Sequence, residues 1–387
     1  MQTVKRRVNV RIAREPIHLD RSLLTAHHFG FLPIQAPRIT KEDLALALNC
    51  GEHPHSDALD RTAFMRSYFE GELSLNTSEP RAFVYKKPVL KTRPGGYALH
   101  FAGSHSGIAE ASLIRAAFSI LSEQGYKNLR LDINCIGDRE SMNLYERELV
   151  SAVRKSDIEL PEDLKESIRD DVFSIFKFNI PEAITLRESL PSSITFLSPQ
   201  ARNYFKEVLE YIEALGIEFR LAPELVGERN HSSHSVFIVK NVESEIESDP
   251  LAIGYRYSRL SRFFGQRKEI PMAGVTIFSK EEEGEKIYKE LPRPKFYLIQ
   301  LGHEAKIRTL SLLELLRSHR IPVRHLLGKD KITAQLAEAE DLRVSHLIII
   351  GQKEALDNTA TIRNMVTRAQ DTVRVADLPQ YLKHIKL

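Results

Sequence analysis

The chain has 387 residues, of which 42% are hydrophobic and 28% are charged, and its formal net charge is +3. This length can supply two or three domains with ordinary apolar cores. A net charge so near zero does not identify a nucleic-acid-binding protein, although a basic patch can still be local. The sequence contains no run of about 18 apolar residues, which excludes a simple transmembrane helix.

The two cysteines, Cys50 and Cys135, are far apart in the chain and lack the spacing of metal ligands. So few cysteines suit a reducing compartment, and we expect a cytoplasmic location with no membrane attachment. Residues 1–20 are basic but are not followed by the apolar segment of a signal peptide, so they are predicted to form an N-terminal arm.

Residues 21–280 carry the patterns of one mixed domain. Two prolines interrupt the apolar run FLPIQAP, residues 31–37, and confine such a strand to an edge or a bend. From Leu129 to Cys135 apolar and polar residues alternate, which predicts an antiparallel strand with one face in water. Residues 109–123 before it and 140–154 after it have helical spacing.

A helix over residues 199–215 has the clearest local signals. Ser198 can cap it, Pro199 suits its first position, and Gly216 can end it. Its apolar stripe consists of Phe205, Val208, Leu209, Ile212 and Leu215. SHSVFIVK, residues 233–240, predicts a further strand.

Residues 281–295 are charged and end in two prolines, as an interdomain linker does. In residues 296–387 the pattern changes to apolar strands that alternate with helices, near 303–319 and 331–341. This alternation predicts a small α/β domain with parallel strands.

The order of elements after residue 331 is specific. A helix ending in EAEDLRV is followed by the strand LIIIG, the turn QKEALDN, the strand TATIRNMVTR and a closing helix DLPQYL. This segment resembles the anticodon-binding domain of class II aminoacyl-tRNA synthetases, most closely the histidyl type. Ile108–Lys155 and LSPQARNYFKEVLEYIEALGIEF resemble the catalytic core of the same family.

The resemblance implies a mixed, mainly antiparallel sheet flanked by helices, followed by a C-terminal α/β anticodon-binding domain. It also implies a homodimer, because FLPIQAP with Pro37 matches the family's first motif, which lies at the subunit interface. Such enzymes join an amino acid to the α-phosphate of ATP, and fixed arginines stabilise the phosphate charge. One arginine aimed at a phosphoryl transition state is worth about 10³–10⁵ in rate.

The positions that match the family's catalytic motifs carry other residues. In the second motif Lys91 replaces an arginine and Arg93 a glutamate. In the histidine-type signature Gly227 replaces an arginine and Asn230 an aspartate. In the third motif Glu281 stands where an arginine belongs. No counterpart of the family's Pro-Glu-Gly-Thr stretch is clear near residues 58–61, so no catalytic residue is assigned.

Two basic clusters are candidates for binding RNA or phosphate. The candidate residues are Lys86, Lys87, Lys91 and Arg93 in the core, and Lys329, Lys331 and Gln335 in the C-terminal domain.

Other polar residues are interpreted as ordinary structure. His231 and His234 lack a cysteine or carboxylate partner at ligand spacing, so no metal site is predicted. Asp20, Glu110 and Asp138 have no partner arrangement that marks a general acid or base. Phe296 and Tyr297 are expected in a core strand.

Three hypotheses follow. The first is a histidyl-tRNA synthetase-like pseudoenzyme that needs no cofactor and binds tRNA, a tRNA-like RNA or a partner protein. The second is a divergent active ligase that uses ATP and Mg²⁺, with Lys91 and either Arg256 or Arg259 as the cations. The third is a regulatory subunit of ATP phosphoribosyltransferase, against which the anticodon-binding-like domain counts.

Overall fold

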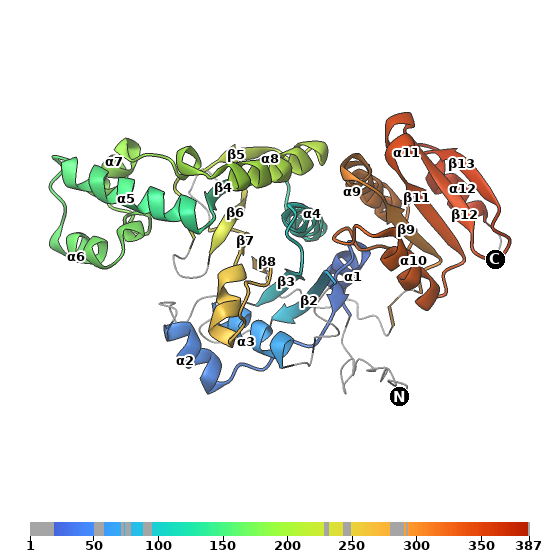
Figure 1. Cartoon of the computed structure of the whole chain (residues 1–387), viewed down its shortest axis with the longest axis horizontal. Helices are drawn as coiled ribbons and strands as arrows, with labels where there is room; N and C mark the ends of the chain where they lie inside the picture. Colours follow the sequence, from blue (N-terminus) through green and yellow to red (C-terminus); the bar gives the residue numbers. More distant parts are fainter. Residues whose placement is uncertain are drawn as a thin grey trace.

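The computed structural model describes residues 19–49, 58–70, 73, 79–87, 95–227, 232–242, 249–278, 290–291 and 293–385. Figure 1 shows α5, α6 and α7 at one end of the molecule and a second, C-terminal sheet at the other. Within the described ranges, no helix is both long enough and apolar enough to cross a lipid bilayer.

The first sheet has eight strands in the order β1-β2-β3-β8-β7-β6-β4-β5. Only the pairs β1/β2 and β4/β5 are parallel, which confirms the expected mixed, mainly antiparallel sheet. The strands are β1 (Leu32–Pro33), β2 (Arg81–Lys87), β3 (Gly96–Ala102), β4 (Leu129–Gly137), β5 (Phe219–Leu221), β6 (Ser233–Asn241), β7 (Ala252–Arg256) and β8 (Met272–Phe278).

Helices cover both faces of this sheet. One face packs its apolar side chains against α1 (Arg21–His28), α4 (Ile108–Glu123) and α8 (Pro199–Ala214). The other face is covered by α3 (Ala58–Phe69) and the 3₁₀ helix η3 (Ser258–Phe264). The remaining elements of the core are α2 (Lys41–Asn49), α5 (Arg139–Lys155), α6 (Glu162–Asp170), η1 (Val172–Phe176), α7 (Pro181–Ser189) and η2 (Ser193–Phe196).

Helix α8 confirms the prediction from local signals. The Ser198 side chain accepts a hydrogen bond from the amide of Ala201, Pro199 occupies the first turn, and Gly216 follows the helix at φ +65°. Phe205, Val208 and Ile212 are buried. The local helix signals therefore agree with the tertiary packing of α8.

Strand β4 corrects the prediction of a face in water. Asp132 and Asn134, on its polar face, are both fully buried. Arg220 and Arg130 hold the Asp132 carboxylate at 2.8 Å and 2.9 Å, and together they outweigh the effect of burial and keep its pKa low. The Asn134 amide donates to the carbonyl of Leu225 at 2.8 Å. The buried polar groups of this strand thus find partners on segments distant in sequence, at Arg220 and Leu225.

The second sheet has five strands in the order β10-β9-β11-β12-β13. The first three are parallel and the last two antiparallel. QKEALDN, expected to be a turn, contains a six-residue helix, α11, and Asn358 after it has φ +54°. The elements are β9 (Phe296–Gln300), α9 (His303–Ser318), β10 (Val323–Arg324), α10 (Ile332–Asp341), β11 (His346–Ile350), α11 (Gln352–Asp357), β12 (Thr359–Asn364), β13 (Gln370–Arg374) and α12 (Leu378–His384).

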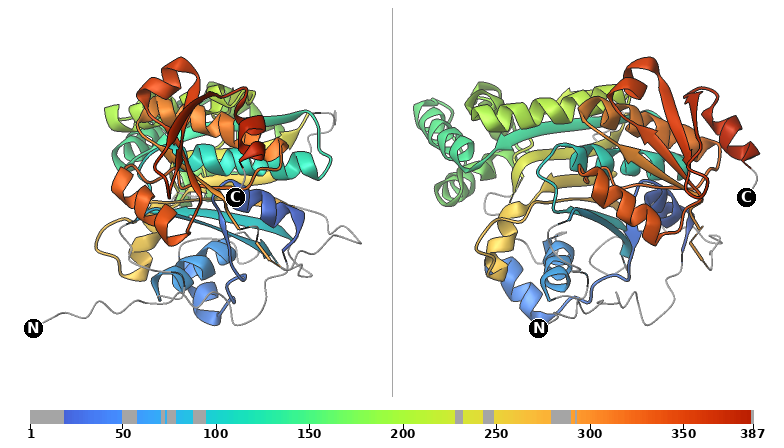
Figure 2. Two further views of the ribbon diagram at one scale, coloured as in Figure 1. Left: turned by 90° about the vertical axis from the view of Figure 1, so that its right-hand side faces the viewer. Right: turned by 45° about the vertical axis from the view of Figure 1, so that its right-hand side comes forward.

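The two sheets belong to one packed body. The apolar core of the first sheet continues through α1 and α4 into α9 of the C-terminal part. Arg115 and Glu314 form an ion pair at 2.5 Å across this junction, and Arg317 pairs with Glu123. His28 Nε2 lies 2.8 Å from the carbonyl oxygen of Leu313. Figures 1 and 2 show the C-terminal part beside α1, α4 and α8.

A buried ion pair ties the first sheet to its helices. Glu110 of α4 has no exposed surface and Arg256 of β7 is 3% exposed. Arg256 Nε donates to Glu110 Oε1 at 2.7 Å, and Nη2 donates to Oε2 at 2.9 Å. Burial lowers the pKa of the Arg256 guanidinium, but the Glu110 carboxylate raises it by a larger amount. The net shift of this pKa is therefore upward. Arg256 also donates to the hydroxyl of Tyr204 and to the carbonyl of Ser104.

Replacing Glu110 by glutamine (E110Q) preserves the side-chain shape and removes the charge that compensates Arg256. An uncompensated buried charge is expected to lower the free energy of unfolding by about 3–5 kcal/mol. Denaturation in urea measures this loss. The matched control is E269Q, because Glu269 pairs with Arg262 at 3.0 Å with both side chains exposed, by 38% and 57%. The control should lose at most about 1 kcal/mol. Equal losses in the two variants would contradict the assignment.

Candidate functional site

The strands that flank the motif-like segments adjoin one another. Lys87 at the end of β2 pairs with Gly96, and Gly96 pairs with Phe278 at the end of β8. The segments that follow Lys87 and Phe278 therefore leave the same end of the sheet. Lys91, Arg93, Asn230 and Glu281 lie outside the described residues, and the predictions for them stay predictions.

Gly227, at the position aligned with an arginine of the family, has a backbone that favours glycine. Its φ is +63°, a region that residues with a Cβ rarely adopt. A Cβ atom there would lie 2.9 Å from Ser232 Oγ and 3.0 Å from Val236 Cγ2. An arginine at this position would be strained and would require the side chains of Ser232 and Val236 to shift, which agrees with the absence of this cation from the site.

Side chains of α3 pack onto the face of β2, β3 and η3. The ring of Phe64 stacks on His100 of β3, with ring centroids 3.9 Å apart and planes inclined by 12°. His100 Nδ1 lies 2.6 Å from the hydroxyl of Tyr257, and Nε2 lies 3.2 Å from that of Tyr85. Burial lowers the pKa of His100 to about 3, with smaller effects from the cations Arg61 and Lys87. The imidazole is therefore neutral at physiological pH and held in a closed aromatic cluster.

The cations beside this cluster are engaged within the chain. Lys87 forms an ion pair with Asp60 at 2.9 Å, and both side chains are at least nine-tenths buried. The guanidinium of Arg61 lies 4.1 Å from the centre of the Tyr255 ring, in a cation–π contact. Lys87 was expected to bind RNA or phosphate, but its side chain is buried against a carboxylate. This corrects its expected position on the surface.

The two arginines that an active ligase would recruit have different environments. Arg256 is bound by Glu110 and by backbone carbonyls on the face of the sheet that α4 and α8 cover. Arg259 is half-buried, and its Nη1 lies 3.0 Å from the sulfur of Met142. Its Nη2 is buried without a hydrogen-bond partner among the described residues, and burial lowers the pKa of this guanidinium. Arg256 is therefore excluded as the second cation, whereas Arg259 is not.

The C-terminal candidates also separate into buried and exposed groups. Lys329 pairs with Glu79 and Glu338, each at 2.9 Å. Gln335 has no exposed surface, and its amide exchanges hydrogen bonds with the backbone of Gln300 at 3.0–3.1 Å. Neither residue is the surface contact that was expected. Lys329 binds carboxylates of the core and of α10, and Gln335 joins α10 to β9. Lys331 is exposed.

Lys86 stays partly exposed in the core, where its ammonium lies 3.3 Å from Asp20. Asp20 also caps α1 through the amide of Leu23 and accepts from the Tyr97 hydroxyl. The Asp138 carboxylate caps α5 through Ser141 and accepts from Ser198 Oγ at 2.5 Å. These acidic residues have structural partners that sequence spacing did not indicate.

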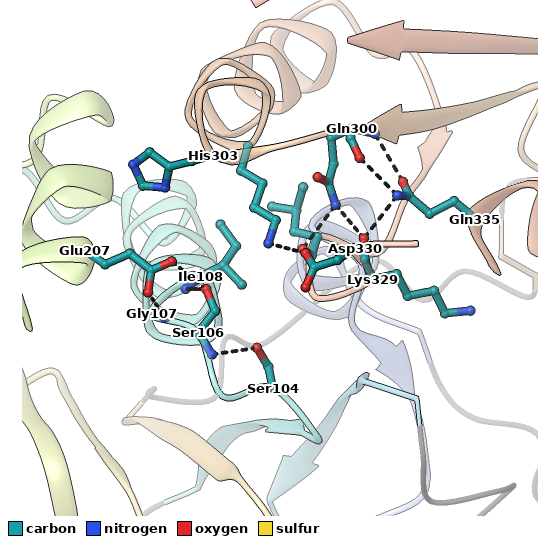
Figure 3. Close-up of polar contacts among 12 residues, drawn as sticks. Ser104, Ser106, Gly107, Ile108, Glu207, Gln300, His303, Lys329, Asp330 and Gln335 are labelled. Atoms are coloured by element: carbon teal, nitrogen blue, oxygen red, sulfur yellow. Dashed lines mark hydrogen bonds and ion pairs between the residues drawn. The ribbon is translucent and has the colours of Figure 1, made fainter. Parts of the chain in front are cut away.

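The amino end of α4 binds a carboxylate of the chain itself (Figure 3). Glu207 of α8 accepts a hydrogen bond from the amide of Gly107 at 2.9 Å and another from Ser106 Oγ at 2.7 Å. Helix amino ends attract anions because their amide groups are unpaired and the dipole is positive. Glu207 fills the amino end of α4, so this end of the helix is not available to a phosphate. The contact could not be predicted from local sequence, because a hundred positions separate the partners.

Pro37 lies in the partly exposed segment between β1 and α2. Among the described residues, no group of three or more histidine, cysteine or acidic side chains could hold a metal ion. Phe296 and Tyr297 are buried in β9, as expected.

Comparisons with known proteins agree with this geometry. The family described as "Anticodon binding domain" matches residues 295–385. The histidine–tRNA ligase of Bacillus licheniformis is 26% identical over 335 residues, covering 82% of this chain and 78% of the relative. Histidine–tRNA ligase 1 of Shouchella clausii is 28% identical, covering 83% and 79%.

The crystal structure of apo S. aureus histidyl-tRNA synthetase shares the fold, with a TM-score of 0.52, 21% identity and 93% coverage of each chain. The expected core and anticodon-binding domain are thus both present. The chain is a class II, histidyl-tRNA synthetase-like protein with a C-terminal anticodon-binding domain.

Proposed function

We propose that the chain is a pseudoenzyme that binds tRNA or a tRNA-like RNA and does not form an aminoacyl adenylate. The observation that carries this proposal is the backbone of Gly227. Where the aligned family residue is an arginine, this chain has a glycine whose positive φ and close approach to Ser232 disfavour any side chain. The closed cluster of Phe64 and His100 and the pairing of Lys87 with Asp60 support the same conclusion.

Aminoacyl adenylation depends on positive charge held at the phosphate oxygens. Adenylation develops negative charge on phosphate oxygens, and each fixed guanidinium aimed at it contributes about 4–7 kcal/mol. Arg61, Lys87 and Arg256 all interact with aromatic rings or carboxylates of the chain itself. A cation already paired with a carboxylate stabilises a transition state much less than one held ready for it.

Pyrophosphate exchange into ATP tests the absence of adenylation. With histidine, or with any other proteinogenic amino acid, we expect exchange at least about 10³-fold below that of an active histidine–tRNA ligase assayed in parallel. Exchange that depends on one amino acid would overturn the pseudoenzyme proposal. The variant R259M would then show whether Arg259 supplies the second cation, with R262M on the same 3₁₀ helix as its control.

The RNA-binding part of the proposal rests on the β12 and β13 portion of one face of the C-terminal sheet, which stays exposed. Helix α10 packs over β9 and β11 on this side. On β12 and β13, alternate residues remain at least partly exposed, and the register pairs Thr359 with Arg374 and Arg363 with Gln370. Two guanidinium groups on a polar sheet surface suit contacts to phosphate and to unstacked bases. Lys331 at the start of α10 would extend this surface.

Equilibrium binding to total tRNA across a salt series tests this surface. The double variant R363A/R374A should weaken binding and reduce the slope of log affinity against log salt by about 1.5, because two phosphate contacts are lost. The matched control R147A/R154A removes two exposed arginines from α5, at the opposite end of the molecule, and should leave the slope unchanged. No saturable binding by the unmodified chain would overturn the RNA proposal in favour of a protein partner.

We also propose a cytoplasmic homodimer whose interface contains Pro37. Ile39, Leu44 and Leu48 beside it are 37%, 38% and 52% exposed, and large apolar side chains gathered on a surface favour self-association. Sedimentation equilibrium should give twice the mass of one chain for the unmodified protein. The variant L48E should have the mass of a single chain. A monomeric unmodified chain would contradict this interface.

A further inference from the structure

A pocket of about 300 Å³ lies at the junction of the two sheets. We call it the junction pocket. From the core it is lined by Gly30 and by Arg81 and Phe83 of β2, and from the C-terminal domain by Arg324, His325 and one face of α10. Its volume is at the lower limit for small-molecule sites, so it suits a compact ligand.

The cations of the junction pocket are unequally satisfied. Lys329 is neutralised by Glu79 and Glu338, each 2.9 Å from its ammonium. Arg324 has no carboxylate within ion-pair distance in the described part of the chain, and its Nη1 lies 3.3 Å from His27 Nδ1. Arg81 Nε is buried and has no hydrogen-bond partner among the described residues. Among the described residues, therefore, two guanidinium groups of the pocket, those of Arg81 and Arg324, have no carboxylate partner.

His325 adds a hydrogen-bond acceptor to the same pocket. It is 2% exposed, and its Nε2 lies 3.1 Å from the carbonyl oxygen of His28. A carbonyl only accepts, so Nε2 carries the proton and Nδ1 is left as an acceptor. Nδ1 is buried and has no donor among the described residues. Burial lowers the pKa of His325 to about 3, which keeps this acceptor unprotonated.

We propose that the junction pocket binds a small carboxylic acid that also carries an amino or hydroxyl group, that is, an α-amino or α-hydroxy acid. The planar guanidinium groups of Arg81 and Arg324 match a carboxylate in shape and charge. An N–H or O–H of the ligand donates to His325 Nδ1, which satisfies the buried acceptor.

The acidic residues of the pocket distinguish this class from phosphates. Glu79, Glu338 and Asp341 also line it, and Asp341 is exposed at the end of α10. Three carboxylates around two unpaired guanidinium groups disfavour a phosphate dianion, whereas a carboxylate bears a single charge. An ammonium group on the ligand would gain from the same carboxylates.

The position of the pocket gives binding a consequence for the whole chain. Its walls come from β1 and β2 on one side and from β10 and α10 on the other. A ligand that contacts both sides binds only the docked arrangement and therefore stabilises it. The proposal does not depend on RNA binding, and each can fail without the other.

Isothermal titration calorimetry on the full chain tests the proposal. The probes are the proteinogenic L-amino acids, L-lactate and L-malate, with acetate and inorganic phosphate as comparison anions. At least one amino or hydroxy acid should bind and raise the melting temperature. Acetate, which lacks the donor for His325, should bind at least about 10-fold more weakly, since a charge-assisted or buried hydrogen bond is lost.

Two variants locate the binding site. R324M should weaken binding at least about 10-fold. A334L fills the pocket from α10 without removing a charge and should abolish binding while the free chain keeps its melting temperature, which covers the case that R324M fails to fold. The control R147M on α5 should bind as the unmodified chain does. Binding that survives A334L, binding of phosphate alone, or no binding by any amino or hydroxy acid would overturn the proposal.

Discussion

The buried pair of Glu110 and Arg256 is the interaction on which the core depends. It is bidentate, with contacts of 2.7 Å and 2.9 Å, and it joins the middle of the first sheet to α4. The same guanidinium donates to Ser104 and Tyr204, so the loop before α4 and the helix α8 share one anchor. Removing either charge leaves the other buried without its counter-charge, so the two residues stabilise the core only together.

This anchor also explains why the arginine content of the chain says little about its chemistry. Arg256 lies on the face covered by α4 and α8, where it stabilises the fold, while the face beneath α3 is closed by aromatic rings. Helix α4 repeats the pattern, because Glu207 occupies the place at its amino end where an anion could bind. In the described part of the core, charges that resemble catalytic remnants in the sequence are mostly counter-charges of a stable scaffold.

The fold could be predicted from the sequence where local signals were sufficient. Ser198, Pro199 and Gly216 mark both ends of α8, and the alternation of apolar strands and helices after residue 296 marks the second sheet. The site could not be predicted in the same way. Asp132 is paired with Arg220 across 88 positions and Glu110 with Arg256 across 146, so no window of sequence contains both partners. Lys329 and Gln335 looked like surface residues because their partners in β9 and in the core are distant.

The backbone at Gly227 has a consequence for the history of the chain. A lost side chain can return by a single codon change where the backbone accepts it without strain, but the backbone at Gly227 favours glycine. A Cβ atom restored here would lie 2.9 Å from Ser232 Oγ and 3.0 Å from Val236 Cγ2, so these side chains would have to shift. Regaining this arginine would therefore take a rearrangement of the local packing as well as a codon change.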